Sequence, residues 1–264
     1  MGPIIVTGGT FGIGKAITLA LAEKGFDVVS FGIDSKQISS IAENSVTSFK
    51  KEVSDFGLDV DVLEADVSKP EDIKRVIDFT IDKYGQIDGL VNNAAIGPLG
   101  SVPETSEEIW DRVIDINLKG TFLCCKEVLP YMIKQRAGAI INIGSGSGWG
   151  KPNMAAYSAS KGGIFALSAS MAYDHLQHGI RVNTVVPGGG GLVTGMSLGR
   201  RHGDINSIIQ TGIHNAHGRI TEPEDVAKTV IFLLSDDAAS ISGTTIDVGC
   251  FAGQGGVVNK PEAK

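Results

Sequence analysis

Residues 4–14 read Ile-Ile-Val-Thr-Gly-Gly-Thr-Phe-Gly-Ile-Gly, and this stretch decides the fold. Its first four residues predict a buried strand over 4–7, and a helical pattern begins at Gly14. Between them, Gly8, Gly12 and Gly14 follow the spacing GxxxGxG. Glycine lets the backbone approach a pyrophosphate closely, and the first turn of a helix offers free N–H donors. The stretch predicts a nucleotide-binding turn, and the alternative is a purely structural connection between strand and helix.

The rest of the chain continues this alternation of short β-rich runs and longer helical patterns. Further strands are predicted over 27–31, 59–64, 89–92, 139–143, 181–185 and 244–248. Helices are predicted over 14–24, 36–56, 70–84, 107–135, 154–178 and 223–234, with one long irregular stretch at 187–217. Several strands are apolar throughout, as expected for strands covered on both faces. The pattern predicts an α/β fold in a single domain, 1–264, with a Rossmann-type doubly wound parallel sheet and helices on both faces.

Composition narrows the classes of function. The 264 residues include 23 Lys and Arg against 30 Asp and Glu, and the formal net charge of −7 argues against nucleic acid as the main partner. No apolar run approaches the ~20 residues of a membrane span, and no signal-peptide pattern begins the chain. Cys124, Cys125 and Cys250 form no disulfide framework and show no metal-ligand spacing. We therefore expect a cytoplasmic protein without a metal, membrane or nucleic-acid partner.

The end of the second predicted strand bears on the choice of cofactor. In dinucleotide enzymes an acidic residue here accepts a hydrogen bond from the ribose 2′-hydroxyl of NAD, whereas an arginine accommodates the 2′-phosphate of NADP. Gly32 stands where the acid is expected, Asp34 follows two residues later, and no arginine is near. NAD is therefore weakly preferred over NADP, although Lys36 is able to reach a phosphate. Asp34 is equally suited to cap the helix that follows.

Tyr157 and Lys161 are four residues apart, which places them on one face of the predicted helix. A tyrosine pKa of about 10 is too high for a base at neutral pH. A lysine ammonium about 4 Å away stabilises the phenolate by about 4 kcal/mol at an effective dielectric of about 20. Alone, such a pair is more often a packed Tyr and a solvated Lys. Its surroundings favour an acid–base device, because Ser145 ends a predicted strand and Asn117 interrupts an apolar helical pattern.

In this order and spacing, the motifs resemble the short-chain dehydrogenase/reductase family over essentially the whole chain. They are Thr7–Gly14, Asp66-Val67, Asn92-Asn93-Ala94-Ala95, Asn117, Ser145, Tyr157-xxx-Lys161, Pro187-Gly188 and Thr194. The resemblance implies about seven strands in the order 3-2-1-4-5-6-7. It also implies an NAD(P)-dependent oxidoreductase that moves a hydride between nicotinamide and a secondary alcohol or ketone.

The resemblance further implies a role for each motif residue. Tyr157 is expected as general acid/base, Ser145 as the group that orients the substrate oxygen, Lys161 as the cation that lowers the tyrosine pKa, and Asn117 as the anchor of a water. The cofactor-binding residues predicted from the glycine turn, from Asp34 and from the resemblance are Gly8, Thr10, Phe11, Gly12, Ile13, Gly14, Asp34, Asp66, Val67, Asn92, Ala94, Tyr157, Lys161, Pro187, Gly188 and Thr194. Ser147 is a rival for the serine role, and the long glycine run after Pro187 blurs the assignment of Thr194.

The substrate is expected under the segment 188–217, whose glycines at 188–191 suit the hinge of a lid. Candidate substrate-binding residues are Ser145, Trp149, Tyr157 and Met196, with core packing as the alternative for Trp149. The run Arg200-Arg201-His202 is either a clamp for an anionic substrate or a solvated turn or subunit contact, and the second interpretation is favoured.

The resemblance also implies a homotetramer or homodimer. Two other functions compete with the oxidoreductase: a cofactor-binding regulatory or scaffold protein without catalysis, and a different reaction on the same fold, such as dehalogenation or isomerisation. The intact glycine turn and the set Asn117, Ser145, Tyr157 and Lys161 favour the oxidoreductase.

Overall fold

One parallel sheet organises the molecule in this computed structural model, which describes residues 2–34, 46–188, 192–210, 212 and 218–249. Its strands are β1 (Ile4–Thr7), β2 (Val28–Gly32), β3 (Val60–Glu64), β4 (Gly89–Asn92), β5 (Gly138–Ile143), β6 (Ile180–Val186) and β7 (Thr245–Asp247). They pair in the order β3-β2-β1-β4-β5-β6-β7. The predicted fold class and strand order are confirmed, and the predicted strand ends differ by one residue or none.

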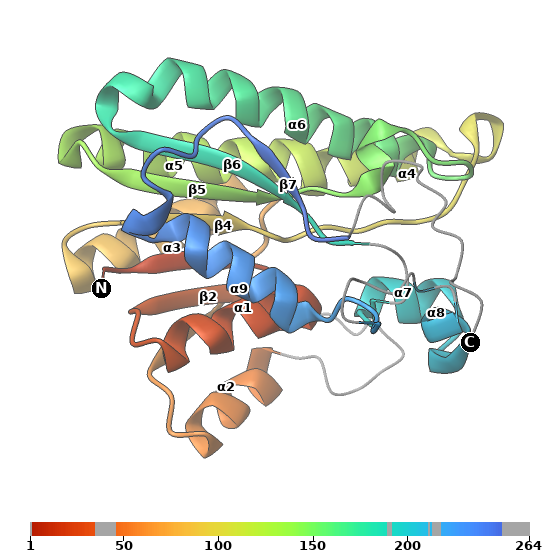
Figure 1. Ribbon diagram of the computed structural model, residues 1–264, viewed down its shortest axis with the longest axis horizontal. Coiled ribbons are helices and arrows are strands. Elements are labelled where there is room, and N and C mark those ends of the chain that lie inside the picture. Colours follow the sequence, from red (N-terminus) through yellow and green to blue (C-terminus); the bar gives the residue numbers. More distant parts are fainter. Residues whose placement is uncertain (1, 35–45, 189–191, 211, 213–217, 250–264) are drawn as a thin grey trace.

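Helices cover both faces of the sheet (Figure 1). On one face lie α1 (Gly12–Glu23), α2 (Val46–Asp55) and α9 (Pro223–Leu234). On the other lie α3 (Pro70–Tyr84), α5 (Gly120–Gln135) and α6 (Ala155–His175), with α4 (Glu107–Ile114) packed beside α6. This two-layered cover follows from parallel strands, because each crossover needs a helix that packs back onto the sheet.

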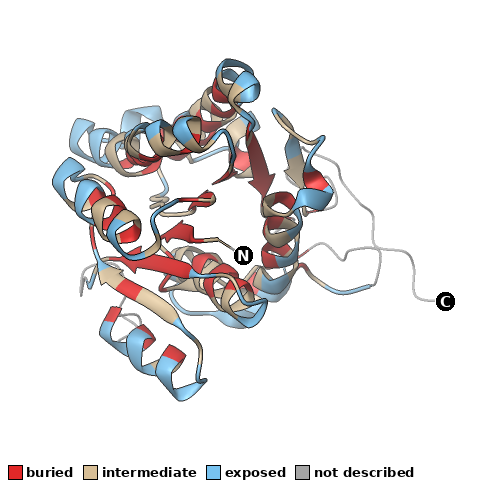
Figure 2. Cartoon of the chain, turned by 90° about the vertical axis from the view of Figure 1, so that its left-hand side faces the viewer, coloured by how far each residue is buried: buried red, intermediate tan, exposed pale blue. Residues whose placement is uncertain are grey.

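Two cores result, one on each side of the sheet. Ile5 and Ile140 point into the core with α3, α5 and α6, while Val6 and Ile141 point into the core with α1 and α9. Successive side chains of a strand face opposite sides, so a strand buried on both faces must be apolar throughout. Figure 2 shows the result: buried strands in the centre, and helices whose outer faces are exposed.

Of the helix predicted over 36–56, the structure describes Val46–Asp55 as α2, and 35–45 lie outside the described residues. Two longer predicted helices are not α-helical throughout. The helix predicted over 107–135 divides into α4, a π-helical turn at Asp115–Lys119, and α5. The helix predicted over 154–178 ends as α6 at His175 and continues as a 3₁₀ turn. Apolar periodicity alone does not distinguish these tighter or wider turns from α-helix.

The stretch predicted as irregular, 187–217, contains two short helices, α7 (Gly195–Arg200) and α8 (Ile205–Gln210). Thr194 begins α7 because its Oγ1 accepts a hydrogen bond from the N–H of Ser197, at 3.2 Å. Both helices lie on the side of the molecule toward which the strands point (Figure 1). They therefore lie at the edge where parallel α/β sheets bind their ligands. Within the described part of the chain, no helix is both long and apolar enough to cross a membrane.

Candidate active site

The glycine turn between β1 and α1 has an open, left-handed backbone. Gly8 and Gly12 have φ values of +60° and +55°, a region that favours glycine. A Cβ on Gly14 would clash with the carbonyl oxygen of Gly8. Phe11, at the N-cap of α1, caps no N–H with its side chain, so donors of the first turn remain available. The turn therefore fits the pyrophosphate of a nicotinamide dinucleotide, because anions bind at such helix starts.

Asn93, which the sequence analysis assigned no role of its own, holds this turn in place. Its Nδ2 donates to the carbonyl oxygens of Thr7 and Gly8, at 3.1 and 2.9 Å. Thr7 Oγ1 in turn accepts from the backbone N–H groups of Asn93 and Ala94, each at 3.0 Å. The signal was a second polar residue directly after a strand. The side chain of its neighbour Asn92 lies in the core, where Nδ2 donates to Asn142 Oδ1 at 2.8 Å. The cofactor contact predicted for Asn92 is thus left to its backbone.

Tyr157 and Lys161 lie on α6 with exposed fractions of only 6% and 2%. Lys161 Nζ donates to the carbonyl oxygen of Ile143, the last residue of β5, at 2.7 Å. Burial lowers the pKa of Lys161 to about 8. Burial also raises the pKa of Tyr157, against the lowering effect of a hydrogen bond with Ser145 and of the positive charge of Arg200.

Two cations lie beside the Tyr157 ring. Lys161 Nζ lies 5.8 Å from the centroid of the ring, and the guanidinium carbon of Arg200 lies 5.1 Å from it. Arg200, to which no such role was assigned, lowers the Tyr157 pKa by its positive charge, while the Lys161 ammonium donates to the end of β5. The pKa of the tyrosine in the protein alone is raised rather than lowered.

Two serines compete for the place beside Tyr157, and the structure separates them. Ser145 begins a 3₁₀ turn at Gly146–Trp149, where its Oγ accepts from the N–H of Ser147 at 3.2 Å. Ser147 is buried, and its Oγ donates to Met154 Sδ at 3.2 Å. Of the two, Ser145 is the one whose side chain lowers the Tyr157 pKa.

Asn117 lies in the π-helical turn between α4 and α5 and is fully buried. Its Oδ1 accepts from the N–H of Ile96 at 2.9 Å, and its Nδ2 donates to the carbonyl oxygen of Ile96 and to Ser160 Oγ, at 2.8 and 3.0 Å. Ser160 Oγ donates to the carbonyl oxygen of Tyr157 at 2.8 Å. Asn117 thus connects the segment after β4 to the tyrosine helix. Ser160 completes this link, and the sequence analysis did not assign it a role.

The remaining cofactor candidates surround the end of β2. A Cβ on Gly32 would come within 2.6 Å of Thr10 Oγ1, which explains the glycine where an acid was expected. Asp34 is exposed and accepts from Thr47 Oγ1 of α2 at 3.2 Å. The helix start that it was predicted to cap, from Lys36, lies outside the described residues. Asp66 Oδ1 accepts from the N–H of Ser68 at 2.9 Å. Val67 packs against Gly120, at the start of α5.

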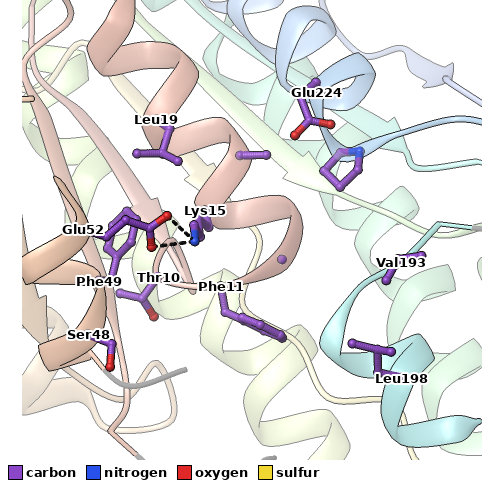
Figure 3. A pocket seen from close by; sticks show the side chains of 13 residues that line it. Thr10, Phe11, Lys15, Leu19, Ser48, Phe49, Glu52, Val193, Leu198 and Glu224 are labelled. Carbon is purple, nitrogen blue, oxygen red and sulfur yellow. Dashed lines mark hydrogen bonds and ion pairs between the residues drawn. The ribbon is translucent and has the colours of Figure 1, made fainter. Parts of the chain in front are cut away.

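A cavity of about 700 Å³ lies in front of the glycine turn (Figure 3). Its lining residues are Thr10, Phe11, Gly12, Lys15, Ala16, Leu19, Ser48, Phe49, Glu52, Val193, Leu198, Pro223 and Glu224. Among these residues Lys15 carries the only positive charge, and its Nζ bonds to Glu52 Oε2 at 2.6 Å. Ile13 packs instead into the core between α1 and α9.

The segment after β6 packs directly on the glycine turn. Gly195 lies so close to the ring of Phe11 that a Cβ would overlap it, and Thr194 lies 3.7 Å from the Cβ position of Gly12. Gly188, after the half-buried Pro187, is packed equally tightly against Gly249. The predicted hinge glycines at 189–191 lie outside the described residues.

Substrate candidates separate into two groups. Trp149 is 45% exposed and stacks on Phe165 with ring centroids 4.8 Å apart, so it is not a core residue. Met196, by contrast, lies beside Gly97, after β4, together with Tyr157 and Arg200. Arg201 and His202 are exposed.

Other chemistry-bearing groups form no centre in the described part of the chain. No group of three or more His, Cys, Asp or Glu side chains there is arranged to hold a metal. Cys124 and Cys125 are buried free thiols, and Cys250 lies outside the described residues.

Comparisons with known proteins agree with this geometry. The family described as short chain dehydrogenase matches residues 3–203. The chain is 38% identical over 250 residues to 2-(S)-hydroxypropyl-CoM dehydrogenase 3 of Xanthobacter autotrophicus, covering 93% of this chain and 94% of that protein. It is 35% identical over 246 residues to the 3-oxoacyl-[acyl-carrier-protein] reductase of Thermotoga maritima, covering 92% and 94%.

Two solved structures share the fold along nearly their whole length. A variant of actinorhodin polyketide ketoreductase with NADPH superposes with a TM-score of 0.84 at 29% identity, covering 96% of this chain and 97% of that one. Levodione reductase superposes with a TM-score of 0.82, also at 29% identity and with the same coverage.

Proposed function

This chain belongs to the short-chain dehydrogenase family, an enzyme family that binds a nicotinamide cofactor and acts on CH–OH or C=O groups, and we propose that it interconverts a secondary alcohol and a ketone with Tyr157 as general acid/base. One observation carries the proposal. Tyr157, Ser145 and Arg200 meet at the carboxyl edge of the sheet, where the glycine turn also lies.

The residues of this edge fit a nicotinamide dinucleotide. Gly8, Gly12 and Gly14 leave room for a pyrophosphate, and the first turn of α1 supplies its N–H donors. The cofactor supplies or accepts the hydride when it is bound. Lys161 and Thr194 are proposed to hold its nicotinamide half, because both lie between the end of β5 and the glycine turn.

In ketone reduction the proton comes from Tyr157. Its raised pKa keeps the hydroxyl protonated at neutral pH, which is the form needed to donate to the carbonyl oxygen. Ser145, whose side chain acts on the Tyr157 pKa, orients that oxygen. In alcohol oxidation Tyr157 must accept a proton instead, so the positive charge of Arg200 favours this direction by stabilising the phenolate. Through these hydrogen bonds, Asn117 holds the segment after β4 in place relative to the helix that carries Tyr157.

The test is a turnover screen of alcohols and ketones with NAD and NADP in parallel, followed by Tyr157→Phe. We expect Tyr157→Phe to lower turnover by about a hundred- to ten-thousand-fold, the usual contribution of a positioned acid–base group. Binding of the reduced cofactor, measured by fluorescence titration, should change little. Full activity in this variant would refute the role. Cofactor binding by the unmodified protein without turnover on any compound would favour a regulatory protein.

NAD rather than NADP is the proposed cofactor, although a structural neighbour was solved with NADPH. In the cavity beside Thr10, the charge of Lys15 is neutralised by Glu52, and Glu224 adds a negative charge. A 2′-phosphate there would meet no unpaired cation among the lining residues, whereas a ribose hydroxyl is neutral. The parallel screen decides this point, because a lower KM for NADP would overturn it.

We further propose that the chain associates with copies of itself and that it is located in the cytoplasm. A shallow apolar hollow joins the start of α5 to α6, lined by Ile114, Leu118, Lys119, Phe122, Gly163 and Leu167. Such a surface suits a second copy of the chain in a homodimer or homotetramer. The buried free thiols of Cys124 and Cys125 suit the cytoplasm. We also retain the proposal of one domain in which 188–217 covers the substrate.

A further inference from the structure

Arg200 is a half-buried cation with no anionic partner among the described residues. Its Nε donates to the carbonyl oxygen of Gly97 at 2.8 Å, and its Nη2 is buried with no hydrogen-bond partner in that part of the chain. In the described part of the chain no Asp or Glu forms an ion pair with it, and Tyr157 is the titratable group whose charge it feels. An uncompensated buried charge is costly, so a protein that keeps one usually places an anion beside it.

The surroundings of Arg200 are built around Gly97. The Cβ position of Gly97 is occupied by the guanidinium of Arg200, by Met196 Sδ and by the ring of Tyr157, so no other residue fits there without displacing them. These groups come from the segment after β4, from α7 and from α6. They converge on the ring of Tyr157, and none of them lines the cavity at the glycine turn. The missing anion therefore belongs on the substrate side of the site.

We propose that the guanidinium of Arg200, which is only half-buried and has no anionic partner among the described residues, binds a carboxylate of the substrate, so that the enzyme acts on short oxo acids and the corresponding hydroxy acids. The inference rests on the proposed oxidoreductase function and names its substrate class. The guanidinium carbon is 5.1 Å from the centroid of the Tyr157 ring, so the carboxylate must lie within a few bonds of the reacting carbon. A 2-oxo or 3-oxo acid meets this condition.

The proposed reaction balances without a further reactant. In reduction, a hydride carrying two electrons adds to the carbonyl carbon, and the C=O π pair takes the proton of Tyr157. The cofactor is oxidised, the ketone becomes an alcohol, and the carboxylate stays unchanged. Arg200 contributes charge and geometry, because a planar guanidinium holds a carboxylate with directional, charge-assisted hydrogen bonds.

The inference distinguishes Arg200 from its neighbour in the sequence. Arg201 follows on the same segment but is exposed, so it is a matched control that changes the net charge equally. Arg200→Gln keeps a hydrogen-bonding side chain and removes the charge. Arg200→Lys keeps the charge but lacks the planar set of N–H donors of a guanidinium. Together with Arg201→Gln, these variants distinguish recognition by the Arg200 guanidinium from a general electrostatic effect.

The experiment compares 2-oxobutanoate and 3-oxobutanoate with their methyl esters as substrates. We expect kcat/KM to be higher for the acids than for the esters. Arg200→Gln should lower this acid-to-ester ratio by about ten- to a hundredfold, the usual range for a hydrogen bond to a charged group. Arg200→Lys should recover part of the ratio, and Arg201→Gln should leave it unchanged. Activity on the esters should fall less, through the loss of the charge beside Tyr157.

Binding gives a readout that is independent of turnover. Propanoate, a carboxylate without a carbonyl, should bind the complex with reduced cofactor in calorimetric titration, and Arg200→Gln should abolish this binding while cofactor affinity is kept. If acids and esters react equally well, or if propanoate binds Arg200→Gln as well as the unmodified enzyme, the inference on Arg200 fails and the oxidoreductase function stands. If no oxo compound reacts but propanoate binding depends on Arg200, the oxidoreductase proposal fails instead.

Discussion

At the scale of single residues, the candidate site places ionisable side chains where burial disfavours their charged forms. Lys161 and Tyr157 are both buried, and burial disfavours the charged form of each: it lowers the pKa of the lysine and raises that of the tyrosine. Arg200, the remaining cation, is the one whose charge favours the phenolate.

A first prediction follows from Lys161. Its pKa is about 8 in the folded chain against 10.5 for an unperturbed lysine, so between these pH values the unfolded chain binds more protons and stability rises with pH. The shift corresponds to about 3 kcal/mol of folding free energy that is missing below pH 8. Lys161→Met has no such titrating group. The free energy of unfolding of the variant, minus that of the unmodified protein, should therefore be larger at pH 7 than at pH 10.5 by about that amount.

Urea unfolding of both proteins over this pH range measures the difference. Parallel pH profiles would show that Lys161 is protonated equally in both states, contrary to the prediction. The same variant should lose catalytic activity, because the contact from α6 to the Ile143 carbonyl disappears.

At the scale of elements, two local features position the site. The π-helical turn at Asp115–Lys119 rotates Asn117 inward, where its amide satisfies both backbone groups of Ile96. Single π-helical turns within helices often occur at functional positions, and here the turn lies between the two parts of a long helical rod. The second feature is the start of α9, which packs against α1 behind the glycine turn.

The start of α9 supports a second prediction. Pro223 is at the first helical position, and Asp225 accepts from the N–H of Glu222 at 3.0 Å and from both terminal nitrogens of Arg219 at 2.7 Å. The hydrogen bonds from Arg219 lower the pKa of Asp225 to about 2. Asp225→Asn should therefore lower the free energy of unfolding by about 1 kcal/mol at neutral pH.

The sign of the pH dependence is fixed by the lowered pKa. The contribution of Asp225 is complete above the ordinary aspartate pKa of 3.8 and is lost as pH falls toward 2. The two proteins should differ in thermal midpoint at pH 7 and approach each other near pH 3. Exchange of the exposed Asp237, which belongs to the 3₁₀ turn after α9, for Asn is the control. An effect of equal size there would assign the change to net charge.

At the scale of the whole molecule, the sheet decides where function is possible. All strands run parallel, so their carboxyl ends meet at one edge, and the glycine turn, Ser145 and Tyr157 gather there although they are far apart in the sequence. The contact proposed between copies lies elsewhere, at the apolar hollow of α5 and α6, which Phe122 lines with 47% of its surface exposed.

A third prediction concerns this surface. Phe122→Glu places a charge at the proposed contact between copies, and burying an unpaired charge is unfavourable. We expect the variant to sediment as a smaller species than the unmodified protein. Phe56→Glu, which changes an even more exposed phenylalanine after α2, should leave the sedimentation coefficient unchanged. Identical sedimentation of all three proteins would contradict the proposed interface.

The sequence alone determined the fold class, the strand order and the main members of the candidate site. Periodicity and glycine spacing are local signals, and parallel topology follows from their alternation. Runs such as Ile140-Ile141 are apolar throughout because each residue faces a different core. The resemblance to the family's motifs led to the prediction of Tyr157, Lys161, Ser145 and Asn117 as site residues, because those motifs are read from residue type and spacing along the chain.

Only the tertiary structure decided what surrounds these residues. The positive charge of Arg200 beside Tyr157 depends on the packing of α7 beside Gly97, a contact between segments 103 positions apart. The π-helical turn, the inward side chain of Asn92 and the pairing of Lys15 with Glu52 are equally non-local. Charge and burial depend on distance in space, and spacing along a chain fixes that distance only within a single helix or strand.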